Sequence, residues 1–251
     1  LTGVLRSVNS SLSYLELLGN QQAARNKYGK QFETLIWRQI TSTSGDVQRL
    51  WFDAFVATAS SSSALEELAG LLTGAAAPAQ LELNQDLRWN IVVRLNRYAH
   101  TRGTQLLAAE RLRDSSEEGK RRALQAEVIG ASVEGKESWL NTALARGDEY
   151  RLMRSRTIMG ALYPSNQRHL MTTQAQQILD RLPQLESEQD SLFFRHISRN
   201  LIPRLCTEAN ITALSKAIDS RQSYEPALDK ALLVARQLDQ RCLAVGANLA
   251  L

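Results

Sequence analysis

The chain has 251 residues, of which 43% are hydrophobic and 22% are charged, values typical of a globular protein with a sizeable core. Its net charge is only +4 and its basic residues do not gather in one run, which favours a solvated surface over a nucleic-acid-binding one. No run of about eighteen apolar residues occurs, so the sequence predicts no membrane-spanning segment.

The first part of the chain is expected to be helical. Apolar residues recur at three-and-four spacing and predict helices over about 5–18, 21–40 and 47–58. A run of serines, Ser60–Ser63, is interpreted as a helix boundary rather than a cluster of nucleophiles, because Ser63 and Glu66 form an S-x-x-E capping box. The helix that follows should end at Gly74.

Residues 74–80, GAAAPAQ, are the best linker candidate, because they are small and include a proline. The linker could extend to residue 84. Whether this segment is a hinge or only a long turn stays open.

The stretch 81–124 should contain three short helices. Asn84 caps the first, whose apolar stripe is Leu87, Ile91, Val92, Leu95, Tyr98 and Ala99. The turn 100–103 separates it from a second helix, and a third begins near Asp114, with Ser115 and Glu118 as a capping box. Glu117 with Arg121, and Glu118 with Arg122, should pair four residues apart. Helices joined by such short turns pack antiparallel.

The second half continues in the same way. Helices are expected from the Ser132 cap, before the stop at Tyr163-Pro164, over about 166–182 and 192–202, over 207–219, and from Pro226 towards the C-terminus. We therefore predict an all-α fold of about eleven to twelve helices in one domain, 1–251, arranged as an α-α superhelix or HEAT-like solenoid. A compact irregular bundle is the alternative.

Chemical motifs are scarce. The sequence lacks H-E-x-x-H, G-x-G-x-x-G, the phosphate-binding P-loop and G-x-S-x-G. Cys206 and Cys242 are isolated in apolar helical context, so buried free thiols are expected. The one local feature of functional interest is Arg151, Arg154 and Arg156, three guanidinium groups within two helical turns that could hold a carboxylate or a phosphate. A solvated helix face is the alternative interpretation of these arginines.

A family resemblance rests on two segments. Asp86-Leu87-Arg88-Trp89 starts one helix, and Ala109-Glu110 is followed by Arg113-Asp114, Gly119 and Arg121. This pattern resembles the C-terminal helical domain of the aminopeptidase N-type zinc metallopeptidases, which include the antigen-trimming aminopeptidases of the endoplasmic reticulum. The bacterial branch is the closer match. Weaker similarity extends over most of the chain, from residues 64–74 to the last helix.

The resemblance implies a fragment of a longer enzyme. In that family the zinc ligands H-E-x-x-H…E and the exopeptidase motif G-x-M-E-N lie in a separate, earlier domain, and neither motif occurs here. The chain also starts at Leu1 with neither an initiating Met nor a signal peptide, and we expect a piece of something longer. It should have no catalytic residue, metal ligand or cofactor of its own and be inactive alone, with zinc in the full-length enzyme.

The resemblance also implies a function. The domain would cap the active site of an enzyme that removes N-terminal amino acids from peptides, and would shape peptide access. Its partners would be the enzyme's own catalytic domain and peptide substrates, with no nucleic acid, and the bacterial cytoplasm is the expected compartment. Arg151, Arg154 or Arg156 would contact a peptide carboxylate. The alternative is a helical-repeat scaffold that binds a protein partner and is unrelated to peptidases.

Overall fold

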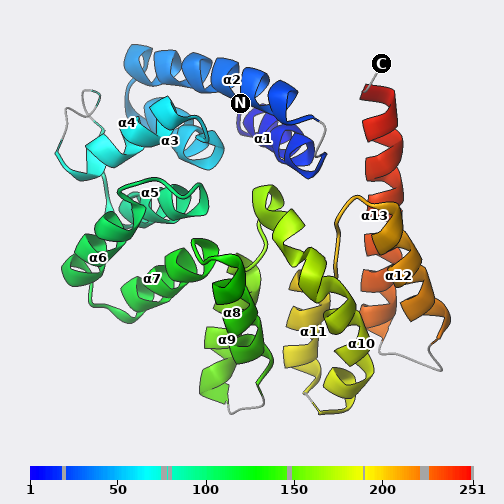
Figure 1. Ribbon diagram of the computed structural model, residues 1–251. Helices are drawn as coiled ribbons and strands as arrows, with labels where there is room; N and C mark the ends of the chain where they lie inside the picture. Colours follow the sequence, from blue (N-terminus) through cyan, green and yellow to red (C-terminus); the bar gives the residue numbers. More distant parts are fainter. Residues whose placement is uncertain are drawn as a thin grey trace. The chain divides into compact units, whose positions relative to one another are not determined.

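A computed structural model describes residues 1–18, 21–74, 78, 81–145, 149–188, 190–220 and 226–249, without the side chains of 149–151. Thirteen α-helices and one 3-10 segment make up its secondary structure, and these residues include no strand (Figure 1). The all-α prediction is confirmed, with one or two helices more than expected. Among the helices described, none combines the length and apolar character needed to cross a membrane.

The chain divides into two compact units, each described here by itself. The first comprises Leu1–Glu16 and Gln21–Gly130, and the second comprises Leu17–Asn20 and Ala131–Leu251. The linker candidate 74–84 therefore lies within the first unit, and residues 75–77, 79 and 80 of it lie outside the described part. The prediction of a single domain stays a prediction.

The first unit contains α1 (Thr2–Leu17, except its last residue), α2 (Gln22–Ser42), α3 (Gly45–Thr58), α4 (Ser62–Leu72), α5 (Gln85–Arg97), α6 (Gly103–Arg113) and α7 (Glu117–Ile129). Helices pack mainly on neighbours in sequence: α2 on α3, α4 on α5, α5 on α6 and α7, and α6 on α7. This is the local packing of a helical solenoid.

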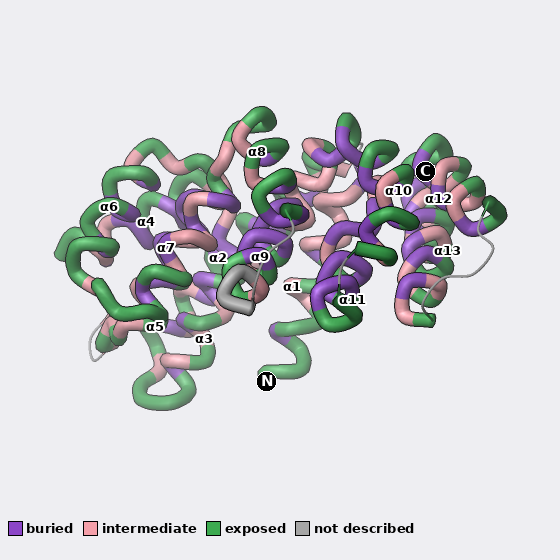
Figure 2. The backbone as a smooth tube through the Cα atoms, turned by 90° about the horizontal axis from the view of Figure 1, so that it is seen from below, coloured by how far each residue is buried: buried purple, intermediate pink, exposed green. Residues whose placement is uncertain are grey.

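The second unit contains α8 (Val133–Leu144), α9 (Glu149–Ala161), the 3-10 segment η2 (Ser165–Met171), α10 (Thr172–Glu188), α11 (Ser191–Asn200), α12 (Glu208–Asp219) and α13 (Pro226–Leu249). Again the contacts are local: α8 packs on α9, α10 on α11 and α12, and α12 on α13, while α11 also contacts α9 and α13. In both units most helices bury one side and expose the other (Figure 2).

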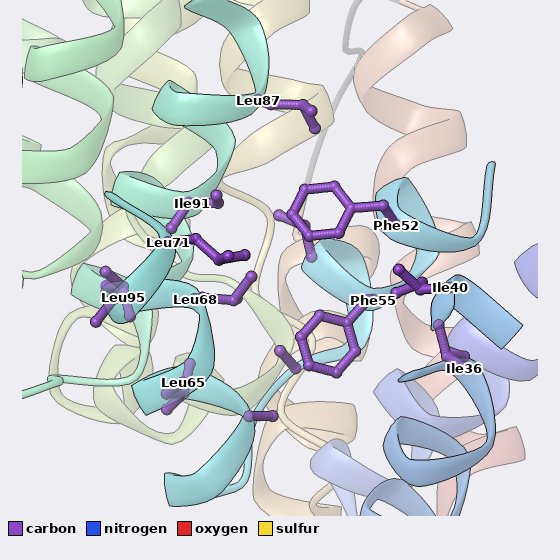
Figure 3. Packing of buried hydrophobic residues seen from close by; sticks show 14 of the residues in the cluster. Ile36, Ile40, Phe52, Phe55, Leu65, Leu68, Leu71, Leu87, Ile91 and Leu95 are labelled. Atoms are coloured by element: carbon purple, nitrogen blue, oxygen red, sulfur yellow. The ribbon is translucent and has the colours of Figure 1, made fainter. Parts of the chain in front are cut away.

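The main core of the first unit joins α2, α3, α4 and α5. Phe52 and Phe55 of α3 point towards Leu68 and Ile91 (Figure 3). The remaining labelled members are Ile36, Ile40, Leu65, Leu71, Leu87 and Leu95. Burial of this apolar surface away from water stabilises the packing of the helices on one another.

Helix α5 is buried on two sides, which the single predicted stripe did not anticipate. Leu87, Ile91 and Leu95 enter the main core, whereas Trp89 and Val92 enter a second cluster with Leu107, Ala123 and Ala126. Ala99 is not part of the helix: α5 ends at Arg97, and Ala99 adopts a left-handed φ of +50° in the turn. Helix α5, within the stretch 81–124, thus contributes to both clusters.

Two of the four predicted helix caps are correct. The Asn84 side chain accepts the Leu87 N–H at 3.0 Å, and the Ser132 hydroxyl accepts the Gly135 N–H at 3.2 Å. The other two lie on neighbouring serines, since Ser61 caps α4 and Ser116 caps α7. Adjacent serines are equivalent as caps in a sequence pattern, and tertiary partners choose between them.

Two further local predictions are wrong. Glu117 pairs with Lys120 and Glu118 pairs with Arg121, three residues along the helix rather than four. Both spacings bring side chains together on a helix surface, so the pattern could not choose between them. The helix expected over about 192–202 is α11, which already ends at Asn200.

Candidate functional site

The residues that carry the family resemblance contact one another. Arg88 of α5 forms an ion pair with Glu110 of α6, with Nη2 2.7 Å from Oε2. The Trp89 indole Nε1 donates to Oδ2 of Asp114 at 2.8 Å. Gly119 lies against Asp114 so closely that an added Cβ would be 2.5 Å from the carboxylate carbon. The motif joins α5, α6 and α7, and its role is structural.

Asp114 organises the turn between α6 and α7. Its Oδ1 accepts the Ser116 N–H at 3.1 Å, and its other oxygen accepts Trp89. Hydrogen bonds from Ser116 and then from Trp89 hold the pKa of Asp114 below its ordinary value. The ionised carboxylate accepts several hydrogen bonds and so fixes the start of α7, because Ser116 is also the N-cap of that helix.

The serine run is part of another buried polar contact. Oε1 of Glu33, from α2, accepts the Ser60 N–H at 2.7 Å and the Ser61 N–H at 3.1 Å. The Ser60 and Ser61 hydroxyls donate to the same carboxylate. The Glu33 side chain thus positions the start of α4, which supports the structural interpretation of Ser60–Ser63 over a nucleophile cluster.

The three predicted arginines all lie on α9, but the structure does not bring Arg154 and Arg156 to one point. The Arg154 guanidinium carbon lies 5.9 Å from the centre of the Trp139 ring, on α8. Arg156 lies near His196 of α11, whose pKa is lowered first by burial and then by the charges of Arg156 and Arg199. Both arginines are exposed, and the side chain of Arg151 lies outside the described residues.

A larger group of cations lies elsewhere in the second unit. A pocket of about 390 Å³ between α11, the loop after it and α13 is lined by Arg195, Arg199, Arg204 and Lys230. We call it the basic pocket. Its other lining residues are Ser198, Ile202, Ala227, Ala231, Val234 and Ala235. Sequence reasoning missed this pocket, because its cations come from three separate segments and only the i,i+4 pair Arg195–Arg199 forms a local signal.

The loop that carries Arg204 is fixed at several points. Cys206 is bonded to Cys242 of α13, with their Cα atoms 5.5 Å apart. Asp239 accepts the Leu205 N–H at 3.1 Å and the Asn210 side-chain amide at 2.8 Å. The expectation of two free thiols is therefore wrong. Their separation of 36 residues concealed that α12 and α13 pack together and bring the loop onto α13.

No group of His, Cys, Asp or Glu side chains suited to a metal ion occurs in the described part of the chain. His100 instead pairs with the Glu66 carboxylate at 2.8 Å. The described residues therefore offer no ligand set that fits a zinc ion.

Comparison with known proteins supports the relationship implied by the motif. The family model for the ERAP1-like C-terminal domain matches residues 2–240. No curated protein matches the chain significantly. The match covers both compact units and includes the motif residues of α5, α6 and α7.

Proposed function

The chain belongs to the ERAP1-like C-terminal domain family, and on that basis we propose that it is the non-catalytic C-terminal domain of a zinc-dependent aminopeptidase. The domain covers the active site in the full enzyme and shapes the access of peptides to it. The observation that carries the proposal is the family match over residues 2–240, together with the ion pair and hydrogen bonds that explain the motif residues as one structural unit. The zinc and the catalytic groups belong to another domain.

Arg154 and Arg156 contact the substrate peptide in this proposal, as does Arg151. Both Arg154 and Arg156 are exposed on α9, and neither forms an ion pair within the described ranges. An exposed guanidinium without a carboxylate partner can form a bidentate contact with a peptide carboxylate. Since the two side chains approach different helices, they would contact different parts of a peptide.

Charge reversal in the full-length enzyme tests this role. Arg154→Glu and Arg156→Glu should lower kcat/KM for long peptides and leave an aminoacyl arylamide, which carries no peptide carboxylate, unchanged. Arg241→Glu on α13 is the matched control, because Arg241 is exposed and lies outside the basic pocket. Unchanged kinetics for short and long substrates in both α9 variants would overturn the peptide contact.

A protein-binding scaffold is the second candidate function. A helical solenoid exposes long faces suited to that role, and nothing in the family motif depends on catalysis. The gene sequence upstream of Leu1 separates the two candidates. A reading frame that encodes G-x-M-E-N and H-E-x-x-H supports the aminopeptidase, and a frame without them leaves the scaffold.

The compartment is also part of the proposal. The sequence led us to expect a bacterial cytoplasmic enzyme, whereas the Cys206–Cys242 disulfide favours an oxidising compartment, because cytosolic thiols are kept reduced. Alkylation of unreduced protein from its native host, followed by mass spectrometry, decides between them. Two alkylated cysteines would support the cytoplasm, and a linked peptide pair would support an oxidising compartment.

A further inference from the structure

The basic pocket gathers positive charge within a small volume of the second unit. Arg199, Arg204 and Lys230 form no ion pair with any described residue, and the lining contains no carboxylate. Arg195 and Arg199 lie four residues apart on α11, so their side chains emerge on the same face. Four cations from α11, the loop and α13 surround one volume.

Burial makes the charge of Arg204 more costly than that of a fully exposed side chain. The pKa of Arg204 is lowered by burial, and Asp239 opposes this only in part. Arg168 of η2 adds to the effect, because burial and then the charge of Arg204 lower its pKa to about 10. An anion placed beside Arg204 would relieve both desolvation and repulsion.

The pocket is preorganised on its loop side. The disulfide at Cys206 and the bond from the Asn210 amide to the Pro203 carbonyl, at 3.1 Å, hold the segment on both sides of Arg204. A fixed guanidinium loses less conformational entropy on binding than a free surface side chain. The volume of about 390 Å³ lies in the range of small-molecule sites.

We propose that the basic pocket binds a dianionic phosphate monoester that carries an apolar substituent. Arg199, Arg204 and Lys230 supply two guanidinium groups and an ammonium, which is more charge than one carboxylate can use, whereas a phosphate presents three acceptor oxygens and a charge near −2. The wall formed by Ile202 and the α13 residues Ala231 and Val234 contacts the substituent. Neither Arg154 nor Arg156, the peptide contacts proposed on α9, is among the lining residues of this pocket.

Titration calorimetry on the full 251-residue chain tests the pocket with three soluble probes. Phenyl phosphate should bind at least about ten-fold more tightly than benzoate, which has the same ring and one negative charge. It should also bind more tightly than inorganic phosphate, which lacks the ring. Sedimentation with vesicles that contain phosphatidic acid distinguishes a lipid source of the phosphate from a soluble one, because only a lipid ligand would bring the chain down with the vesicles.

Variants place the binding in the pocket. Arg199→Gln and Lys230→Gln change exposed side chains and should each weaken phenyl phosphate binding by about ten-fold, whereas Arg241→Gln on the same helix as Lys230 should leave it unchanged. Circular dichroism checks that the variants remain folded. Equal affinity for benzoate and phenyl phosphate, or an equal loss in all three variants, would overturn the proposal.

Discussion

Glu16 is a carboxylate that several side chains of the first unit share. Its oxygens lie 3.0 Å from Arg25 and 3.2 Å from Arg97, and its Oε1 accepts the Tyr98 hydroxyl at 2.6 Å. Both Glu16 and Arg25 have side chains that are only 4% exposed. Removing one charge from a buried group of this kind leaves the others without compensation.

Glu16→Gln should therefore lower the free energy of unfolding by about 3–5 kcal/mol. The amide keeps the shape of the side chain but removes the charge that Arg25 and Arg97 share. Urea denaturation followed by circular dichroism measures the change. Glu66→Gln is the matched control, because Glu66 also pairs with two partners, His100 and Arg102, but is 62% exposed. The control should change stability by less than about 1 kcal/mol, and equal effects would contradict the argument.

Lys136 is a buried cation of the second unit. Its Nζ donates to the Leu162 carbonyl at 2.7 Å, near the end of α9, and burial lowers its pKa to about 8 from an ordinary 10.5. Between these two values the unfolded chain holds the proton more strongly than the folded one, so stability rises with pH in that window. Burial raises the pKa of Tyr163 to about 12, which acts in the opposite sense above its ordinary 10.0.

Unfolding free energies from about pH 7.5 to about pH 9.5 should therefore rise in the natural chain and stay flatter in Lys136→Met. Methionine has a similar volume but no charge, so the variant removes the titrating group and largely keeps the packing. Chemical denaturation at each pH gives the two curves. If both curves run parallel, the Lys136 proton is not the source of the slope.

At the scale of single helices, the sequence was most informative where periodicity and caps agreed. The Asn84 cap was correct, and the apolar stripe placed α5 to within two residues at its end. The pattern could not show that Trp89 packs in a second cluster, because helical periodicity identifies only one apolar stripe on a helix. Helix α10 was expected to end before Pro183 and instead continues to Glu188. The buried Leu182 and Leu185 hold the last turn against the core despite the missing N–H.

The candidate sites were less accessible to sequence reasoning. The motif residues Arg88, Glu110 and Asp114 could be recognised as a family pattern, but their contacts link positions 22 and 25 residues apart. The basic pocket depends on how α11 packs on α13, and the disulfide depends on how α12 packs on α13, and no local pattern encodes either contact. The spacing of charged residues along the sequence, unlike that of apolar residues, does not predict which helix a side chain will face.

Gly119 offers a test of the α6–α7 junction. In Gly119→Ala the new Cβ would meet Asp114, including its backbone oxygen, which cannot rotate away. We expect a loss of about 1–3 kcal/mol in thermal or urea unfolding. Gly160→Ala is the control on α9, where an added Cβ meets nothing within 4 Å. There the substitution should stabilise by about 0.5–1 kcal/mol, as for an exposed helical glycine. If both substitutions lowered the free energy of unfolding by the same amount, Asp114 would not be what limits the space at Gly119.

At the scale of the whole molecule, the two units have separate means of stabilisation. The first depends on the core around Phe52 and on the Glu16 ion pairs, and the second contains the disulfide and the buried Lys136. The predicted helical class and its local packing followed from amphipathic periodicity, since each helix needs mainly its sequence neighbours. The division after Gly130 did not follow from it, because residues 130–132 form a short turn between two helices like other turns of the chain.

Reduction of the Cys206–Cys242 disulfide should therefore destabilise the second unit selectively. The bond closes a loop with a separation of 36 residues, for which chain entropy predicts about 3–4 kcal/mol. Hydrogen exchange with mass spectrometry, with and without a phosphine reductant, should show faster exchange in α12, α13 and the loop at Arg204, with α2–α5 unchanged. Glu16→Gln should instead speed exchange in α2–α5 and leave α12, α13 and the loop at Arg204 unchanged. Faster exchange throughout the chain in either case would mean that the two units unfold as one cooperative body, because a perturbation confined to one unit would then lower the protection of both.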